Sequence, residues 1–194
     1  STGSTSNGPL VLDAPAGTVN GDLLIMTVSA ELDANEQISF NIPTGWTTLS
    51  PLTIYSSSRS PYGAVAWAAW YKTANSEQDS YLITPDHDNP IDGSVVRIDG
   101  QKTTKPILSR MSQGTAANAF SFTSVTSSSD NSLILRFATW GQSRTLTSSP
   151  ALSGIYHINN VNGHSNFAGY TTQATAGPSP TILSFLSGSS AFVD

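Results

Sequence analysis

A strand–loop–strand pattern that occurs twice is the feature that most constrains how this chain folds. The stretch Gly63–Thr84 reads GAVAWAAWYKTANSEQDSYLIT, and a weaker copy, NFAGYTTQATAGPSPTILSF, returns near the end of the chain. Ala74 in the first copy corresponds to Ala174 in the second. Upstream, the run GDLLI at Gly21 is answered by NSLIL at Asn131. The sequence therefore predicts one β motif used in two similar halves.

The first copy leaves a helix open as an alternative. An Ala-rich run such as AVAWAAW suits both structures, and periodicity alone does not separate them. The second copy has Gly169 at the corresponding place, beside aromatic residues, which favours a strand.

Other apolar or alternating runs predict further strands along the chain. Together with the repeated motif they cover Pro9–Leu12, Asp22–Ala30, Ile38–Ile42, Ala64–Tyr71, Ser80–Thr84, Gly93–Ile98, Ile107–Met111, Ala119–Thr123, Leu133–Trp140, Ile155–Ile158, Asn166–Thr172 and Thr181–Phe185. No convincing helix interrupts them. This pattern predicts an all-β fold, namely a two-sheet antiparallel β-sandwich that is jelly-roll-like and built from two pseudo-repeated halves.

The expected organisation is one domain behind a polar lead-in. Ser1–Gly8 has almost no side chain to bury and is predicted to be a linker or a frayed end. Residues 9–194 are predicted to form a single sandwich, with halves at about 9–124 and 125–194, because β-sandwiches of this length often do not split. Ser50–Tyr62 and Gly141–Pro150 are predicted as loops.

The dipeptide Asn162-Gly163 is typical of a type I′ hairpin turn, which needs positive φ at both positions. A turn there would place Ile158 opposite Phe167.

Composition excludes several classes of function. Charged residues make up only 11% of the chain and the net charge is −5, so no basic stripe is present for binding nucleic acid. The absence of cysteine removes disulfides and thiolate metal sites. No apolar run approaches the roughly 20 residues of a membrane helix, so membrane insertion is not expected.

An acidic segment after the second strand of the first copy is the best metal candidate. Asp86, Asp88, Asn89 and Asp92 offer the oxygen ligands that suit Ca²⁺ at short spacing. Two positions depart from the calcium-loop pattern, since a proline interrupts the ligands and an arginine replaces the final glutamate. A solvated turn is the alternative, and we predict no tightly bound metal and no cofactor.

Catalytic signatures are weak. Glu31, Asp33, Glu36 and Glu77 could be recruited as a glycosidase pair, but three of them lie in one loop, where solvated charges are the plainer interpretation. No nucleophile elbow, zinc-binding His-Glu-x-x-His motif or phosphate-binding loop occurs. We predict a protein that is not an enzyme. The four tryptophans, at 46, 67, 70 and 140, are predicted to lie in the core.

The loop between the first half's central strands is the best candidate for ligand binding. The segment from Gly45 to Trp70 is about nine residues longer than its counterpart, and extra loop length is where function is often placed. The predicted ligand-binding residues are Tyr55, Arg59 and Tyr62, which could stack on and hydrogen-bond a sugar, assisted by Asp86, His87 and Asp88. An ordinary exposed loop or a subunit contact is the alternative.

The runs APAGTVNGDLLIMTVSA, PTGWTTL, AVAWAAWYKTANSEQDSY and NSLILRFATW resemble a β-sandwich domain of tailed-bacteriophage virion proteins, which also occurs in large bacterial surface proteins. The resemblance spans nearly the whole chain and rests on turn and core residues. It implies a fold and a virion-surface, extracellular setting, and it implies no catalytic residues. It also leads us to expect one strand before Ser1 and a completed strand after Phe192, supplied by a longer polypeptide or by a neighbouring subunit through β-augmentation.

These observations predict a non-catalytic module on a phage fibre, spike or head appendage that attaches to host-surface glycans. Its other expected partners are virion proteins and further copies of itself. The alternatives are a structural capsid decoration or fibre-assembly protein and, in third place, a carbohydrate-active enzyme or its binding module.

Overall fold

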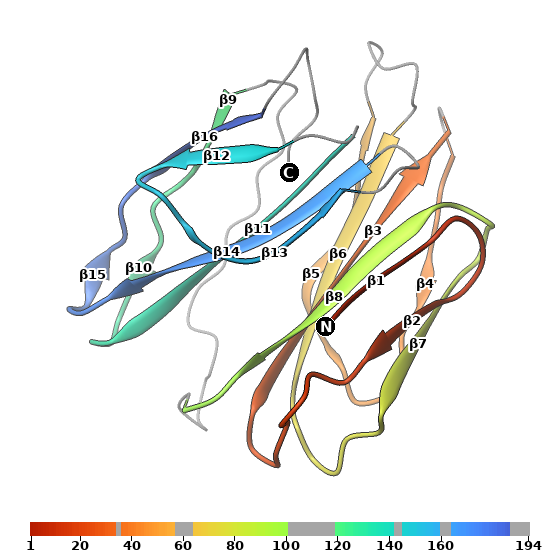
Figure 1. Ribbon diagram of the computed structural model, residues 1–194, viewed down its shortest axis with the longest axis horizontal. Helices are drawn as coiled ribbons and strands as arrows, with labels where there is room; N and C mark the ends of the chain where they lie inside the picture. Colours follow the sequence, from red (N-terminus) through yellow and green to blue (C-terminus); the bar gives the residue numbers. More distant parts are fainter. Residues whose placement is uncertain (34–35, 57–63, 101–118, 142–144, 160–163, 187–194) are drawn as a thin grey trace. The chain divides into compact units, whose positions relative to one another are not determined.

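The computed structural model describes residues 1–33, 36–56, 64–100, 119–141, 145–159 and 164–186. These residues form strands joined by turns, with no helix among them (Figure 1). Every strand pair is antiparallel. The prediction of an all-β antiparallel fold is therefore confirmed. The chain divides into two compact units, Ser1–Pro106 and Ile107–Asp194.

The first unit contains a five-stranded sheet and a three-stranded sheet. The larger sheet has the order β1-β8-β3-β6-β5, and the smaller has the order β2-β7-β4. The strands are β1 (Thr2–Thr5), β2 (Leu10–Asp13), β3 (Leu23–Leu32), β4 (Phe40–Asn41), β5 (Thr47–Ser56), β6 (Ala64–Thr73), β7 (Ser80–Pro85) and β8 (Ile91–Ile98).

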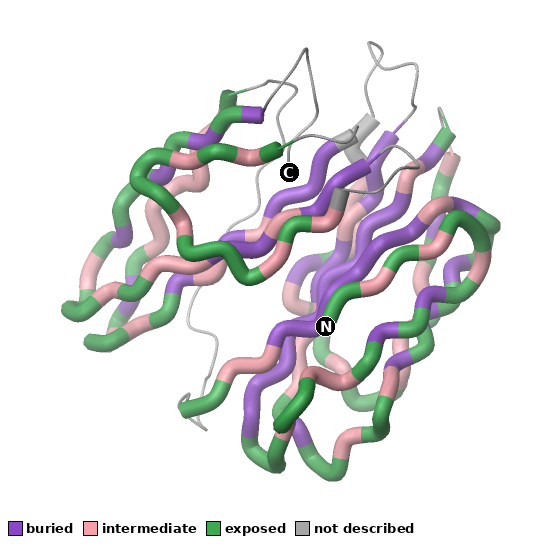
Figure 2. Tube along the Cα trace, in the orientation of Figure 1, coloured by how far each residue is buried: buried purple, intermediate pink, exposed green. Residues whose placement is uncertain are grey.

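A single hydrophobic core joins these two sheets. Leu24, Met26 and Val28 of β3 pack against it from the larger sheet, while Leu12 of β2 and Ile83 of β7 contribute from the smaller one. Each of these side chains is fully buried. In Figure 2 the buried residues, coloured purple, run along the middle of the larger sheet. Because the two inner faces share one core, this unit is a β-sandwich.

Two glycines allow strands of the two sheets to approach closely. Gly3 of β1 lies opposite Gly93 of β8. A Cβ on Gly93 would lie 2.8 Å from Leu10 Cδ2 and 2.9 Å from the Thr27 carbonyl oxygen, and a Cβ on Gly3 would lie 2.9 Å from the Val11 carbonyl oxygen. No side chain fits at either position without a shift of its neighbours.

The described residues of the second unit form three small sheets. Their orders are β11-β14-β13, β12-β16-β9 and β10-β15. The strands are β9 (Ala119–Phe122), β10 (Thr126–Ser127), β11 (Ser132–Gly141), β12 (Leu146–Ser149), β13 (Ser153–Asn159), β14 (His164–Gln173), β15 (Gly177–Pro178) and β16 (Ile182–Leu186).

The core of this unit lies between its two three-stranded sheets. Trp140 and Ala138 of β11 pack with Leu186 of β16, and four half-buried residues surround them: Phe120, Phe122, Leu146 and Phe167. Trp140 is completely buried, as predicted for the core. Trp46 and Trp70 are half-buried against the core of the first unit.

A buried arginine ties parts of the second unit together. Arg136 of β11 is 5% exposed. Its guanidinium donates to the Thr171 hydroxyl at 3.0 Å, the Ser179 hydroxyl at 3.3 Å and the Pro180 carbonyl at 3.0 Å. Burial lowers the pKa of Arg136. The charge is thus held by neutral oxygens of two separate segments, β14 and residues 179–180.

The two units share several local features. Gly21 and Asn131 both have positive φ, and their amides donate to the Ala74 and Ala174 carbonyls respectively. Residues 64–71 and 164–171 have the same order of buried and half-buried positions. The central ladders differ in register, however. Leu23 pairs with Thr73, whereas its counterpart Leu133 pairs with Thr172, one residue before the counterpart of Thr73. The pseudo-repeat, and the single domain with halves near 9–124 and 125–194, therefore stay predictions.

Three expectations about strands and linkers were wrong. Ser1–Gly8 is not simply a linker, because Thr2–Thr5 forms β1 and hydrogen-bonds along β8. Strand β5 occupies much of the predicted loop 50–62; two register shifts around Pro51 destroy the alternation that would have revealed it. Strand β12 likewise lies within the predicted loop 141–150.

The expected hairpin register was wrong by one residue. Phe167 lies opposite His157, and Ile158 lies opposite Asn166. The turn residues Asn162 and Gly163 lie outside the described residues, as does the predicted strand Ile107–Met111.

Candidate functional site

Three connections leave the five-stranded sheet of the first unit at the same end. Strand β3 ends at Leu32, which pairs with Ala64 at the start of β6, and Ser56 at the end of β5 pairs with Ala64 as well. Strand β8 begins at Ile91, opposite Ala30. Segments 33–39, 57–63 and 86–90 therefore start or finish within a few strand spacings of one another, at roughly 5 Å per strand. We call this the loop end of the first unit.

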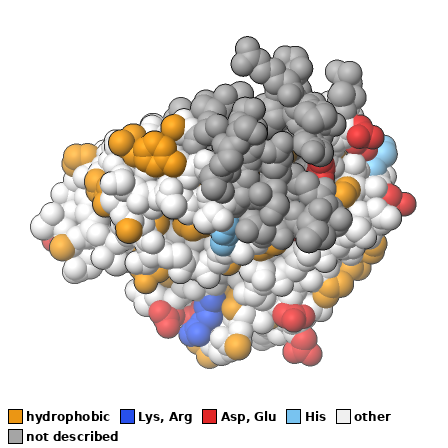
Figure 3. Space-filling model, turned by 45° about the horizontal axis from the view of Figure 1, so that its top comes forward, with side chains coloured by type: hydrophobic (Ala, Val, Ile, Leu, Met, Phe, Trp, Pro, Cys, Tyr) orange, Lys and Arg blue, Asp and Glu red, His pale blue; other side chains and the backbone are white. Residues whose placement is uncertain are grey.

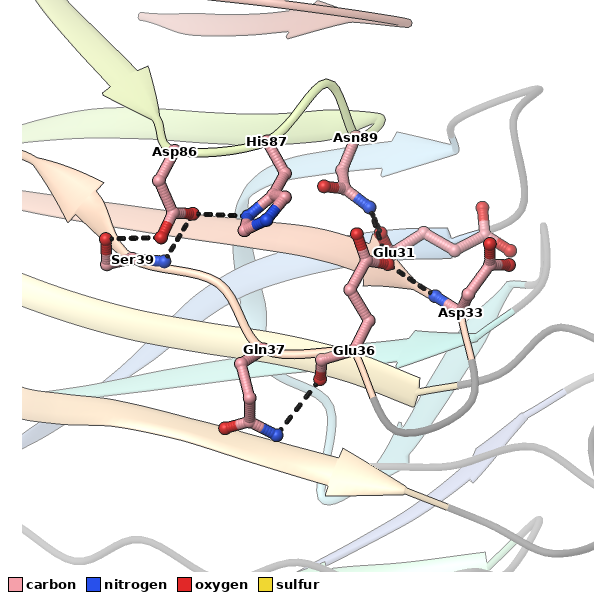
Figure 4. A network of polar contacts seen from close by, with 8 residues as sticks. All are labelled: Glu31, Asp33, Glu36, Gln37, Ser39, Asp86, His87 and Asn89. Carbon is pink, nitrogen blue, oxygen red and sulfur yellow. Dashed lines mark hydrogen bonds and ion pairs between the residues drawn. The ribbon is translucent and has the colours of Figure 1, made fainter.

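An exposed carboxylate ties two of these segments together. The Asp86 carboxylate accepts the Ser39 amide at Oδ1 and the Ser39 hydroxyl at Oδ2, each at 2.8 Å (Figure 4). The Asp86 amide donates in turn to the Ser39 carbonyl at 3.1 Å. The Ser39 amide, then the Ser39 hydroxyl and His87, lower the pKa of Asp86 to about 2. Asp86 is therefore a fixed anion at neutral pH.

A second set of hydrogen bonds orders the neighbouring turn. The Asn89 side-chain amide donates to the Glu31 carbonyl at 3.1 Å and to Glu36 Oε2 at 2.9 Å. The same Glu36 oxygen accepts the Asp33 amide at 2.8 Å. Asn89 is 7% exposed, and its Oδ1 has no hydrogen-bond partner within the described part of the chain. Asp33 and residues 36–39 are thus cross-linked to segment 86–90.

Exposed polar groups project from this surface. His87 Nδ1 lies 3.0 Å from Asp86 Oδ1, and the side chains of His87 and Asp86 are 56% and 44% exposed. Asp88 is also exposed. The loop end therefore offers an imidazole and carboxylates to a ligand in solution, with the first carboxylate held in place by the backbone.

The structure brings together only part of the predicted ligand-binding set. Asp86, His87 and Asp88 are consecutive in the described turn, while Arg59 and Tyr62 lie outside the described residues. Tyr55 lies in β5 close to the loop end, since it pairs with Val65. Sequence reasoning missed Ser39, because its partner is 47 positions away and its own segment reads as a plain strand.

The carboxylates considered as a glycosidase pair are separated. Glu77 lies in the turn between β6 and β7, at the end of the sheet opposite the loop end. There Glu77 Oε1 pairs with Lys72 Nζ at 2.9 Å, and Glu77 Oε2 accepts the Tyr81 hydroxyl at 2.7 Å. Burial acts to raise the pKa of Glu77, but hydrogen bonds from Asn75, Tyr81 and Lys72 outweigh it and lower the pKa. Glu77 thus has a structural role in its turn.

Within the described ranges, no group of three or more His, Asp or Glu side chains is arranged to hold a metal ion. The prediction that no metal is tightly bound stays a prediction, with a test given below.

The surface has the neutral character that the composition indicates. On the face shown in Figure 3, most of the described atoms are neither charged nor apolar side chains, and the charged groups are scattered in small numbers. None of the described segments is a helix long and apolar enough to cross a membrane.

Comparisons with protein-family models, with curated proteins and with solved structures each found no significant match. The resemblance to phage virion domains therefore stays an expectation drawn from the sequence.

Proposed function

We propose that this protein is a non-catalytic surface module of a bacteriophage virion, carried on a fibre, spike or head appendage, and that it attaches to host-surface glycans. The contact is made by the loop end of the first unit. Asp86, His87 and Asp88 contribute to it from one segment, and Tyr55, Arg59 and Tyr62 from the neighbouring one. Virion proteins and further copies of the chain are the other proposed partners.

The observation that carries this proposal is the Ser39–Asp86–His87 arrangement. A sugar presents many hydroxyl groups, which are bound best by acceptors and donors already fixed in place. Asp86 is fixed by two hydrogen bonds of 2.8 Å and still has 44% of its side chain exposed. Such a carboxylate can accept a sugar hydroxyl without further ordering of its own segment.

The non-catalytic part of the proposal is supported by the positions of the carboxylates. A glycosidase needs two carboxyl groups facing each other across the scissile bond, about 5–10 Å apart. Glu77 is engaged at the opposite end from Asp86, and Glu36 is engaged by Asn89 and the Asp33 amide. The remaining exposed acids of the loop end suit binding.

A glycan array with the purified full chain tests the proposal, after light scattering has established its oligomeric state. We expect selective binding to bacterial surface glycans. The double variant His87→Ala/Asp88→Ala should weaken it about tenfold or more, as expected for the loss of two hydrogen-bonding groups. The matched control is Asp79→Ala, which removes an exposed carboxylate from the turn at the other end of β7.

The variant Tyr55→Ala/Tyr62→Ala tests the second segment in the same assay. Unchanged glycan binding in both double variants would exclude the loop end as the contact. No binding by a well-folded wild-type sample would instead favour the alternative of a capsid decoration or fibre-assembly protein.

A further inference from the structure

Asparagine is followed by glycine at three places in the chain, and two of these pairs lie in turns with different surroundings. The pairs are Asn7-Gly8, Asn20-Gly21 and Asn162-Gly163, of which the last lies outside the described residues. In such a pair the backbone nitrogen of the glycine can attack the side-chain carbonyl carbon of the asparagine, because glycine has no Cβ to hinder the approach. The hydrogen bonds of each pair decide whether these two groups can meet.

Both reactive groups of Asn20-Gly21 are held by long-range hydrogen bonds. The Gly21 amide donates to the Ala74 carbonyl at 2.9 Å, and the Asn20 side-chain oxygen accepts the Ser76 amide at 2.7 Å. The attacking nitrogen and the attacked side chain are thus each fixed to the turn that follows β6. The reaction at Asn20 therefore requires a local opening that breaks both bonds.

The reactive groups of Asn7-Gly8 are not held in this way. Within the described part of the chain, the Gly8 amide and the Asn7 side chain make no hydrogen bond. Asn7 is exposed, and a Cβ added to Gly8 would have no atom within 4 Å.

Only the backbone of Asn7 is engaged. The Thr5 hydroxyl donates to the Asn7 carbonyl at 2.8 Å, and the Asn7 amide donates to Thr5 Oγ1 at 3.4 Å. Both bonds are exposed and join residues only two positions apart. They oppose the rotation that brings the two reactive groups together less than the long-range bonds at Asn20 do, because exposed local contacts open most easily.

We propose that Asn7 is a site of spontaneous deamidation, and that this modification alters the turn between β1 and β2. The Gly8 nitrogen loses its proton and forms a bond to Asn7 Cγ, and the side-chain nitrogen leaves as ammonia, which gives a cyclic succinimide. Water then opens the ring at either of its carbonyl groups. The product at position 7 is aspartate or isoaspartate, and water is the only co-reactant. This proposal does not depend on glycan binding.

The isoaspartate product disturbs the turn more than the aspartate product. Its main chain runs through the former side chain, so the connection between β1 and β2 gains a carbon atom, and the carbonyl that accepts the Thr5 hydroxyl becomes part of a free carboxylate. Strands β1 and β2 are tightly packed, since a Cβ on Gly3 would lie 2.9 Å from the Val11 carbonyl oxygen. We therefore expect isoaspartate to loosen β1 from β8, with which it pairs.

Peptide mapping by mass spectrometry tests the site, after incubation of the folded full chain at mildly alkaline pH. Asn7 should deamidate about tenfold or more faster than Asn20, because Asn20 reacts only in the opened turn. The matched control is the same chain in denaturant, in which the two rates should become similar. In Asn7→Gln the product at position 7 should disappear, since the longer side chain would have to close a larger ring, and Asn20 should react as before.

Equal rates at Asn7 and Asn20 in the folded chain would overturn the proposal, as would an Asn7 that reacts about tenfold or more slowly in the folded chain than in denaturant. Hydrogen exchange of the separated isoaspartate form tests the effect on β1. Its β1 amides should exchange faster than those of Asn7→Asp, which carries the added charge without the added carbon atom. Equal exchange in these two forms would refute the effect on β1.

Discussion

At the scale of single residues, the loop end depends on a long-range contact between a serine and an aspartate. Ser39 supplies both its amide and its hydroxyl to Asp86. The folded-state pKa of Asp86 is lower than its ordinary value of 3.8. Its contribution to stability is therefore complete above about pH 4 and is lost as the pH falls toward 2.

Replacing the serine tests this account. In Ser39→Ala the backbone hydrogen bond remains and the hydroxyl is lost, so the pKa of Asp86 should rise from about 2 part of the way to 3.8. Carboxyl resonances followed by NMR across the acid range would measure it. Ser153→Ala, at an exposed serine of β13, is the control and should leave the Asp86 pKa unchanged. An unchanged pKa in Ser39→Ala would contradict the assigned cause.

The acidic turn also gives a prediction about calcium. The carboxylate oxygens of Asp86 and Glu36 are engaged by Ser39, His87, Asn89 and the Asp33 amide, which leaves few free oxygens that could converge on an ion. Adding calcium to a metal-free sample should therefore leave the melting temperature unchanged. An increase of several degrees, absent in Asp88→Ala, would show that a calcium site exists.

At the scale of elements, the closest approach in the first unit is made where glycine replaces a side chain. Gly93 of β8 lies against Leu10 of β2 and the backbone of β3. Backbone atoms cannot rotate away, so an added methyl group forces the strands apart.

We expect Gly93→Ala to lower the free energy of unfolding by about 1–3 kcal/mol, the usual cost of overpacking. Gly154→Ala is the matched control, because Gly154 also lies in a strand and no atom would lie within 4 Å of its Cβ. The control should change stability by no more than about 0.5 kcal/mol. Chemical denaturation of the three chains would measure both effects, and equal losses would refute the close-approach argument.

Elements marked by a local apolar pattern could be predicted from sequence, and elements that depend on long-range pairing could not. Strands β3, β6 and β11 could be predicted, since apolar runs or alternation mark them directly. Strand β1 could not, because TGST has no apolar side chain and becomes a strand only through pairing with β8. Strand β5 was hidden by Pro51 and its register shifts. The predicted ligand-binding site stays a prediction, and Ser39, which holds Asp86 in place, depends on a long-range contact that no local pattern encodes.

At the scale of the whole molecule, each compact unit holds its own core. One core is built around Leu24, Met26 and Ile83, and the other around Trp140 and Leu186. Units with separate cores can unfold in separate steps, in which case a single melting temperature does not describe the chain.

We therefore expect calorimetry to resolve two unfolding transitions. Gly93→Ala should lower the temperature of one transition. Arg136→Ala should lower that of the other, because it removes the hydrogen bonds that the guanidinium donates to the Thr171 hydroxyl and the Pro180 carbonyl. A single transition lowered by both variants would contradict this expectation and would support one cooperative domain.

The two turns that flank β7 lie at opposite ends of that strand, which allows the protein to be attached to a surface in one orientation. The chain contains no cysteine, and Asp79 is exposed in the turn before β7, whereas segment 86–90 follows that strand. Asp79→Cys would thus introduce one thiol at the far end of the sheet from Asp86. Coupling through that thiol would tether the protein to a sensor chip in one defined orientation, with the loop end of the first unit directed away from its point of attachment.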